Sequence, residues 1–252
     1  RARGLQILAI TDHSGGLGVT GGLNEEDIAR QRAEIEALQQ EFGDSLRLLQ
    51  CAEVEIRADG SLDYRDDILA QFDLVIASLH TSLRQPRAQV TARLLNAIQN
   101  PHVDIIGHPT GRLLPDREGA DLDMDAVLTA AAASGVALEI NANPQRLDLD
   151  DIYARRAAQM GIRLAINTDA HHPDHLAQEV FVGQHRLQVI DGGAQRAVFL
   201  GELVALKAGQ ALQPHLEDRL GLRLGEVADL VLGAGGDLLV RAAGAAQELA
   251  QA

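Results

Sequence analysis

The sequence has few of the residues on which several classes of protein depend. Aromatic residues make up 2% of the 252 positions and tryptophan is absent, so a core must be built from leucine, isoleucine, valine and alanine. The one cysteine, Cys51, excludes a disulfide within the chain and fits a reducing compartment. Because Cys51 lies in an apolar run, we expect a small buried side chain rather than a nucleophile.

Long apolar segments are also missing. No run reaches the ~18 to 20 apolar residues that cross a membrane, and the first residues do not have the pattern of a signal peptide. The sequence therefore predicts a cytoplasmic protein with no membrane partner.

Positive charge is scarce. The chain has 22 Lys and Arg against 36 Asp and Glu, which gives a formal net charge of −14, and Lys207 is its only lysine. Proteins that hold nucleic acid through its phosphates usually present a basic surface, so we expect weak non-specific affinity for nucleic acid. The charge does not exclude phosphate chemistry at bound metal ions, because such ions reverse the local charge.

What the chain does have is a series of six short apolar runs, each followed by an acid, a histidine or an asparagine. With 46% hydrophobic residues, its length is enough for one domain with its own core. Strands that are apolar throughout, with polar residues at their carboxyl ends, are typical of a parallel α/β barrel. The runs span 5–10, 46–52, 74–78, 103–107, 136–140 and 162–166.

Helical patterns separate several of these runs. Asn24 can cap a helix that begins with three acids and stops at Gly43. Right-handed crossovers through such helices would bring all six strand ends to one face. The apolar stripes that predict the helices are Ile28, Ile35, Leu38 and Phe42; Val90, Leu94, Leu95 and Ile98; Val127, Leu128 and Ala131; and Ile152, Tyr153 and Met160.

The strand ends supply a set of metal-binding side chains. A single histidine after a strand is more often structural than a ligand, but six candidates at equivalent strand ends predict a metal site. Imidazole and carboxylate together suit zinc, manganese or iron, and a carboxylate such as Glu53 can bridge two ions. The predicted ligands are His13, Glu53, His80, His108, Asp169 and His171.

Two arginines and two asparagines lie on the loops above the predicted barrel. Arg112 and Arg146 could each hold phosphate oxygens through paired hydrogen bonds, or could pair with a local acid at the surface. Asn141 and Asn143 could support the metal ligands through hydrogen bonds, or could only shape the turn before Pro144.

These residues lie in stretches that resemble the successive motifs of the PHP (polymerase and histidinol phosphatase) superfamily. The resemblance runs from about residue 1 to 188, and the fourth and fifth stretches resemble most the C-terminal PHP domain of bacterial family X DNA polymerases. The stretches are ITDHS at 10–14, AEV at 52–54, SLH at 78–80, GHPTGR at 107–112, EINANP at 139–144 and NTDAH at 167–171.

The resemblance implies a distorted (β/α)7 barrel of the TIM type that holds up to three divalent ions, Mn²⁺ or Zn²⁺. It implies a phosphoesterase, which in the polymerase branch trims DNA 3′ ends as a manganese-dependent 3′–5′ exonuclease. Glu53 would bridge two metals, His80 and His108 would complete one, and Asp169 would bind the second. His13 and His171 would bind the third. Asp12 would support the ligands without contacting a metal itself.

The chain also departs from the family pattern. Family members begin with a strand ending in a His-x-His pair and then a helix, and this sequence shows neither. We therefore expect residues 1–190 to form a PHP domain that lacks its first strand and helix, with polymerase domains upstream in the intact protein. Residues 191–252 are rich in Gly, Ala and Leu and are predicted to be a divergent helical or poorly ordered tail, with helix-like stretches at 198–207 and 238–249.

Three functions remain open from the sequence. The first is a metal-dependent phosphoesterase that processes DNA 3′ ends, and the second is a phosphatase of small phosphate esters, similar to histidinol phosphatase. The third is a catalytically inactive fragment that binds metal through Glu53, His80 and His108.

Overall fold

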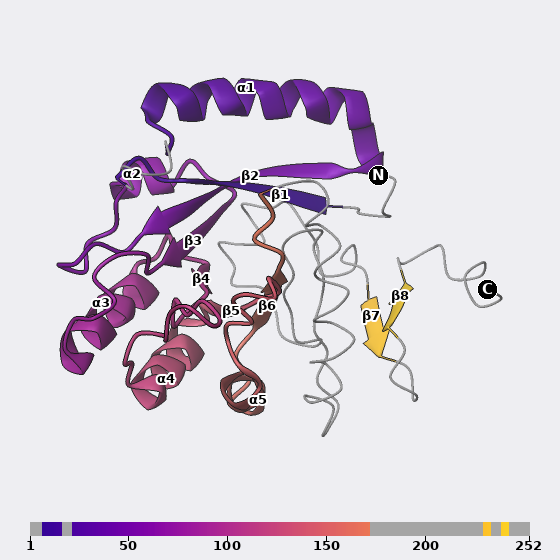
Figure 1. Cartoon of the computed structure of the whole chain (residues 1–252). Coiled ribbons are helices and arrows are strands. Elements are labelled where there is room, and N and C mark those ends of the chain that lie inside the picture. Colours follow the sequence, from indigo (N-terminus) through magenta and orange to yellow (C-terminus); the bar gives the residue numbers. More distant parts are fainter. Residues whose placement is uncertain (1–6, 17–21, 172–228, 233–237, 242–252) are drawn as a thin grey trace.

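The computed structural model describes residues 7–16, 22–171, 229–232 and 238–241. Its centre is a sheet of six parallel strands that lie side by side in the order in which they occur along the chain (Figure 1). The strands are β1 (Ile7–His13), β2 (Arg47–Glu55), β3 (Leu74–Ser78), β4 (Ile105–Gly107), β5 (Ala137–Asn141) and β6 (Leu164–Asn167).

The six strands confirm the six predicted runs, and the sheet curls into a half-barrel. Across the described residues the sheet has six strands and no pairing between β6 and β1, so the seven strands implied by the resemblance are not all seen. An α/β half-barrel is the architecture that the structure supports.

Helices connect the strands as crossovers. Asn24 caps the first one, since its side chain accepts from the backbone N–H groups of Glu26 and Asp27 at 2.9 and 3.0 Å. The short helix between β2 and β3 was not predicted from the sequence. The helices are α1 (Glu25–Phe42), α2 (Asp66–Leu69), α3 (Arg87–Gln99), α4 (Met124–Ser134) and α5 (Asp151–Gln159), with a 3-10 turn at Gly43–Ser45.

Two of the predicted apolar stripes are partly wrong. On α5, Ile152 and Met160 are 63% and 44% exposed, and the helix packs through Ala154, Ala157 and Ala158 instead. On α1, Leu38 is 41% exposed. The small alanines let α5 approach the sheet closely, a preference that a search for large apolar residues does not detect.

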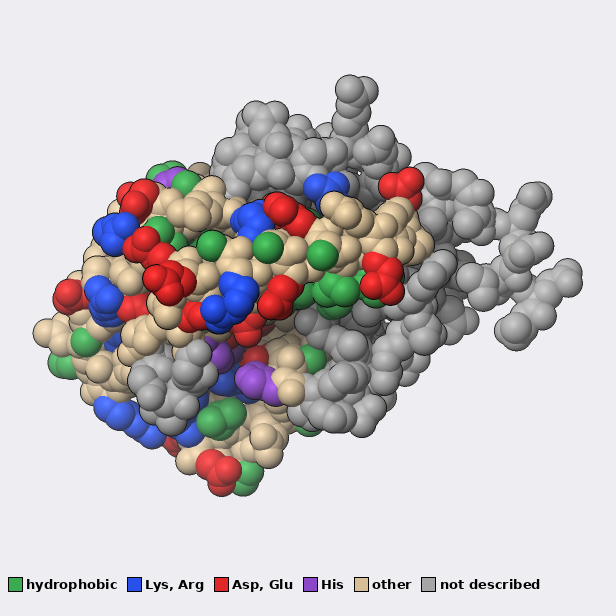
Figure 2. All heavy atoms as spheres, turned by 90° about the horizontal axis from the view of Figure 1, so that it is seen from above, with side chains coloured by type: hydrophobic (Ala, Val, Ile, Leu, Met, Phe, Trp, Pro, Cys, Tyr) green, Lys and Arg blue, Asp and Glu red, His purple; other side chains and the backbone are tan. Residues whose placement is uncertain are grey.

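The two faces of the sheet differ in character. Paired residues of neighbouring parallel strands point to the same side, so Val54, Ala77 and Ile106 share the outer face. There they join the main apolar core with buried residues of α3, α4 and α5. Helix α1 covers the outer face of β1 and β2 through a smaller apolar cluster, and its far side carries charges of both signs (Figure 2).

The inner face of the sheet is mixed. It carries apolar residues such as Ile76 and the fully buried Cys51, which confirms the expectation for the cysteine. Toward the carboxyl ends of the strands it carries Glu53, Glu139 and Asn167. The polar chemistry is therefore collected inside the half-barrel, at the ends of its strands.

The last described segments form a hairpin, with β7 (Asp229–Leu232) antiparallel to β8 (Leu238–Arg241). The helix predicted for 238–249 is thus wrong over 238–241, where Leu, Leu, Val and Arg pair as a strand. The helix predicted for 198–207 lies outside the described residues. No helix among the described residues is long and apolar enough to cross a membrane.

Candidate metal centre

A cavity of about 350 Å³ opens inside the half-barrel at the carboxyl ends of the strands. Five of the six predicted ligands line it, all except His80, and the fold thereby brings together residues up to 158 positions apart, from His13 to His171. Its walls are made by Ala9, Thr11, Asp12, His13, Glu53, Ile76, His108, Glu139, Asn167, Asp169, Ala170 and His171.

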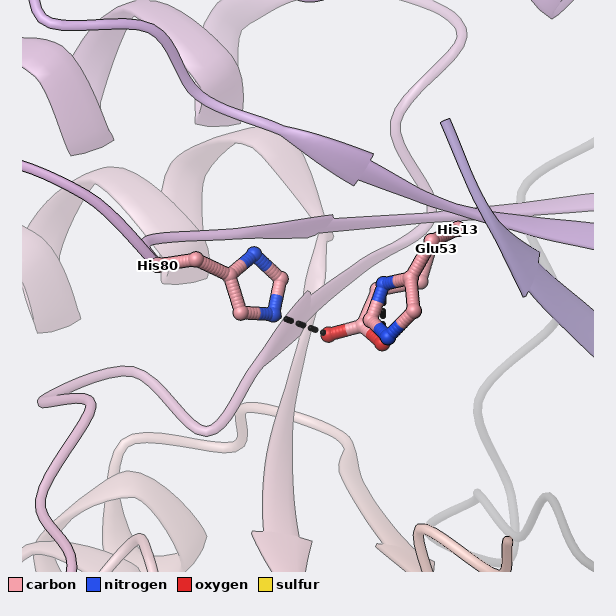
Figure 3. A group of neighbouring side chains, drawn as sticks. All are labelled: His13, Glu53 and His80. Carbon is pink, nitrogen blue, oxygen red and sulfur yellow. Dashed lines mark ion pairs between the residues drawn. The ribbon is translucent and has the colours of Figure 1, made fainter. Parts of the chain in front are cut away.

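Glu53, at the end of β2, is the centre of the group. Its Oε1 lies 2.9 Å from His108 Nε2 and 3.1 Å from His80 Nε2, and its Oε2 lies 3.3 Å from His13 Nδ1. Figure 3 shows His13 and His80 directed at this carboxylate from neighbouring segments. One carboxylate thus receives three imidazole rings from the ends of three other strands.

The imidazole nitrogens facing Glu53 are the atoms that a metal would need. His13 Nδ1, His80 Nε2 and His108 Nε2 are buried and have no hydrogen-bond partner within the described residues. Ligand atoms of His13, Glu53 and His80 all lie within 4.8 Å of one another. Buried polar atoms are normally paired, so nitrogens directed at one carboxylate without hydrogen-bond geometry fit a divalent ion with mixed nitrogen and oxygen ligands.

Glu55, two residues further along β2, orients His80. Its Oε2 lies 2.8 Å from His80 Nδ1 and accepts from the His80 backbone N–H at 3.0 Å, while its Oε1 accepts from the Thr81 hydroxyl at 2.6 Å. A carboxylate on one ring nitrogen fixes the tautomer and directs the other nitrogen, here toward Glu53. The sequence analysis missed Glu55, although its spacing of two residues from Glu53 places both on one face of a strand.

The charges of this group move the pKa values in opposite directions. Burial lowers the pKa of His80, but the carboxylates of Glu53 and Glu55 outweigh it and raise that pKa to about 9. Burial likewise opposes protonation of His108, yet Glu53 raises its pKa. Burial raises the pKa of Glu53, but the adjacent imidazole rings of His108 and His80 outweigh burial and bring that pKa well below its usual range.

Asp169 and His171 lie across the cavity from this group, beyond β6. Asp169 Oδ2 accepts from Asn141 Nδ2 and from Arg146 Nε, each at 3.1 Å. The His171 ring centroid is 6.3 Å from that of His13, and its Nδ1 lies 2.9 Å from the Asp169 carbonyl oxygen. Both residues line the cavity but stand apart from the tight group around Glu53.

Glu139 is a second buried carboxyl that the sequence analysis did not single out. It accepts from Asn167 Nδ2 at 2.7 Å and from the backbone N–H of His108, so it links the ends of β4, β5 and β6. Burial raises its pKa to about 7, aided by Asp169 and opposed by His108. The sequence did carry a signal for Glu139, because an acidic residue within an otherwise apolar strand is unusual.

The remaining predicted residues take mixed positions. Arg112 donates from Nε to the Arg146 carbonyl at 2.7 Å and from Nη2 to the Leu147 carbonyl, so it fastens two loops together. Asn143 accepts from the Gln145 N–H at 3.0 Å. This contact shapes the turn around Pro144, which is the second of the two roles considered for Asn143. Asp12 is exposed at the cavity edge and accepts from Gln31 of α1.

Fold and site together define an α/β half-barrel protein whose histidines and carboxylates gather at the carboxyl ends of its strands. No family model matches the chain. It is 48% identical over 174 residues to the DNA polymerase/3′-5′ exonuclease PolX of Bacillus subtilis, in an alignment that covers 69% of this chain and 30% of that protein. It is 32% identical over 179 residues to a probable phosphatase of Thermoanaerobacter sp. strain X514, covering 67% of this chain and 68% of the relative.

Solved structures share the fold. A histidinol phosphate phosphatase from Lactococcus lactis, complexed with zinc, L-histidinol and phosphate, matches with a TM-score of 0.54 and 21% identity over 81% of this chain and 88% of that one. The chain therefore belongs to the PHP superfamily, close to the family X DNA polymerases. It spans about a third of the length of the polymerase that it matches.

Proposed function

We propose that this chain is a metal-dependent phosphoesterase of the PHP type that removes nucleotides from DNA 3′ ends. The observation that carries the proposal is the convergence of His13, His80 and His108 on Glu53, with their facing nitrogens unpaired within the described residues. The identity of 48% to a polymerase with 3′–5′ exonuclease activity favours DNA as the substrate.

The chain's own residues divide the work between two sides of the cavity. Glu53, His80 and His108 would hold a divalent ion, Mn²⁺ or Zn²⁺, and Glu55 would keep His80 in place. His13, Asp169 and His171 would hold further ions on the other side. Bound ions would act as Lewis acids and offset negative charge on the phosphate oxygens.

We assign the substrate phosphate to Arg146, which pairs with Asp169 in the wall of the cavity. Its Nε donates to Asp169 Oδ2, while its Nη1 is buried and has no hydrogen-bond partner within the described residues. A buried guanidinium N–H without an acceptor is costly, and a phosphate oxygen at the cavity would satisfy it. Arg112 supports this position by holding the Arg146 carbonyl, and Asn141 supports it by holding Asp169.

A phosphatase of small phosphate esters is the second candidate. It is favoured by the probable phosphatases among the relatives and by the fold shared with histidinol phosphate phosphatase. The cavity of about 350 Å³ is large enough for a small ester, so geometry alone does not choose between the substrates.

Metal content and hydrolysis, measured on the same preparations, test the proposal. Elemental analysis after dialysis should find at least one equivalent of a divalent transition metal per chain, and manganese should support nucleotide release from a 3′-labelled single-stranded oligonucleotide. Glu53→Gln and His108→Asn should each lose metal and activity. His102→Asn serves as the matched control, because this histidine lies outside the cavity.

Each alternative has its own signature in this experiment. Rapid hydrolysis of histidinol phosphate with no action on DNA would move the assignment to the small-ester phosphatases. Metal binding without hydrolysis of either substrate would support the inactive fragment. Metal content below one equivalent, unchanged in Glu53→Gln, would remove the metal site itself.

A further inference from the structure

Four arginines lie on the three loops that follow β3, β4 and β5, at the same edge of the sheet as the metal centre. Arg84 is on the loop after β3, Arg112 and Arg117 are on the loop after β4, and Arg146 is on the loop after β5. We call these four residues the arginine rim. In Figure 2, Lys and Arg side chains lie beside the His side chains of the visible cavity edge.

Backbone contacts hold the three loops against one another. Arg117 donates from Nε to the Gly111 carbonyl at 2.9 Å, and a Cβ at Gly111 would lie 3.2 Å from the Leu79 carbonyl oxygen and from Leu83. Leu83, the residue before Arg84, therefore packs against the glycine whose carbonyl Arg117 binds. Arg112 reaches the third loop through the Arg146 carbonyl.

The loop that carries Arg84 is itself fixed. The guanidinium of Arg93, buried on α3, donates to the carbonyls of Thr81 and Ser82 at 3.2 Å and to Gln85 Oε1 at 2.8 Å. Arg84 is exposed between these anchored residues. Because the loop backbone is anchored, Arg84 loses less entropy when it binds an anion than it would on a mobile loop.

One arginine of the rim, Arg146, pairs with an acid, Asp169. Among the residues that the structure describes, no carboxylate forms an ion pair with Arg84, Arg112 or Arg117, although Asp116 and Glu118 flank Arg117 in the sequence. Burial and the charges of Arg146 and Arg84 lower the pKa of Arg117. In a chain of net charge −14, such a concentration of one sign marks a place for an anionic ligand.

We propose that Arg84 and Arg117 form a second phosphate subsite, which binds a phosphodiester next to the one held at the cavity by Arg146. The ligand it takes is a single-stranded DNA end, because a small phosphate monoester has no second phosphate to fill it. This inference rests on the proposed function and gives it a means of preferring a nucleic-acid strand over a small ester. The subsite binds backbone phosphates and carries no aromatic residue on which a base could stack. It therefore does not distinguish one DNA sequence from another.

The test compares a substrate with one phosphate and a substrate with many. Manganese-loaded protein is assayed on bis(para-nitrophenyl) phosphate and on a short oligothymidylate, as the wild type and as Arg84→Ala, Arg117→Ala and the double variant. We expect kcat/KM on the oligothymidylate to fall roughly tenfold for each lost charged contact. Activity on bis(para-nitrophenyl) phosphate should stay unchanged.

Binding gives a readout that does not depend on catalysis. Fluorescence anisotropy of a labelled oligothymidylate at several salt concentrations should show a slope of log affinity against log salt that is smaller by about 0.7 per lost phosphate contact. Arg30→Ala is the matched control, since it removes the same charge from an exposed arginine on α1. It should change neither activity nor slope.

The possible failures are separable. Wild-type protein that hydrolyses neither substrate contradicts the proposed function, and the salt slopes then still decide on the subsite. Equal losses on both substrates, unchanged slopes, or the same effect from Arg30→Ala each overturn the subsite. Arg84 forms no ion pair with another described residue, so Arg84→Ala keeps the test valid even if Arg117→Ala, which loses the bond to Gly111, folds poorly.

Discussion

His80 lies between two carboxylates, and this position makes the stability of the metal-free protein depend on pH. Its pKa in the folded chain is about 9, against about 6.5 for an unperturbed histidine. A group whose pKa is raised by folding stabilises the fold fully below its unfolded pKa, and this contribution is lost as the pH rises through the folded pKa. The pairs with Glu53 and Glu55 therefore weaken between about pH 6.5 and 9.

We expect the free energy of unfolding of chelator-treated protein to fall across this window, as measured by urea denaturation at successive pH values. His108 acts in the same direction, because Glu53 raises its pKa as well. His80→Gln should flatten the dependence, whereas His102→Gln should leave it intact. A stability that rises between these pH values would contradict the ion pairs around His80.

Strand β4 has only three residues, and its last one shows how closely the inner face is packed. A Cβ at Gly107 would lie 2.4 Å from Ser78 Oγ and 2.8 Å from Ile76 Cγ2. We expect Gly107→Ala to destabilise the fold by about 1–3 kcal/mol through overpacking, measured by urea denaturation. Adding Ser78→Ala should recover part of the loss, because it removes the nearer atom, while Ser78→Ala alone should cost little.

The loops after β4 and β5 are joined by one buried carboxylate. Asp148 Oδ2 accepts from the backbone N–H groups of Thr110 and Gly111 at 3.0 and 2.9 Å and from the Thr110 hydroxyl at 2.9 Å, although burial raises its pKa. Asp148→Ala leaves these donors unpaired and should cost about 1–3 kcal/mol in thermal or urea unfolding. Asp148→Asn keeps an acceptor oxygen and should cost less. Equal losses would show that Asp148 acts only by filling space.

The elements that could be predicted are those whose evidence is local. Apolar runs gave all six strands, and caps such as Asn24 and Gly43 gave helix ends, because hydrophobic periodicity and capping act over a few residues. The alanine face of α5 and the short α2 were missed, since neither shows a large apolar stripe. The pairing of Asp148 with Thr110 depends on contacts between distant loops, which no local pattern encodes.

The site could be predicted in its chemistry better than in its geometry. The sequence named the residues that gather at the cavity, from His13 to His171, because parallel strands bring their carboxyl ends to one edge. It did not show that Glu53 is the centre, that Glu55 and Glu139 support the group, or that Arg112 binds backbone carbonyls. Those assignments need the register of the strands and the path of the loops.

For the molecule as a whole, metal binding and folding should be linked. A ligand that binds only the folded chain stabilises it by about 2.7 kcal/mol when its free concentration is 100 times the dissociation constant. We expect manganese or zinc to raise the melting temperature of the dialysed protein in calorimetry, and a chelator to reverse the effect. Glu53→Gln should abolish this rise. A rise that persists in Glu53→Gln would place the stabilising ion elsewhere.

The single cysteine, Cys51, can report the opening of the half-barrel. Cys51 is fully buried on β2, two residues before Glu53, so a disulfide reagent can reach its thiol only when the strands separate. Under conditions where reclosing outpaces labelling, the modification rate reports the free energy of that opening, without an introduced probe or denaturant. Ions bound at Glu53 should therefore slow the labelling of a thiol that they do not touch.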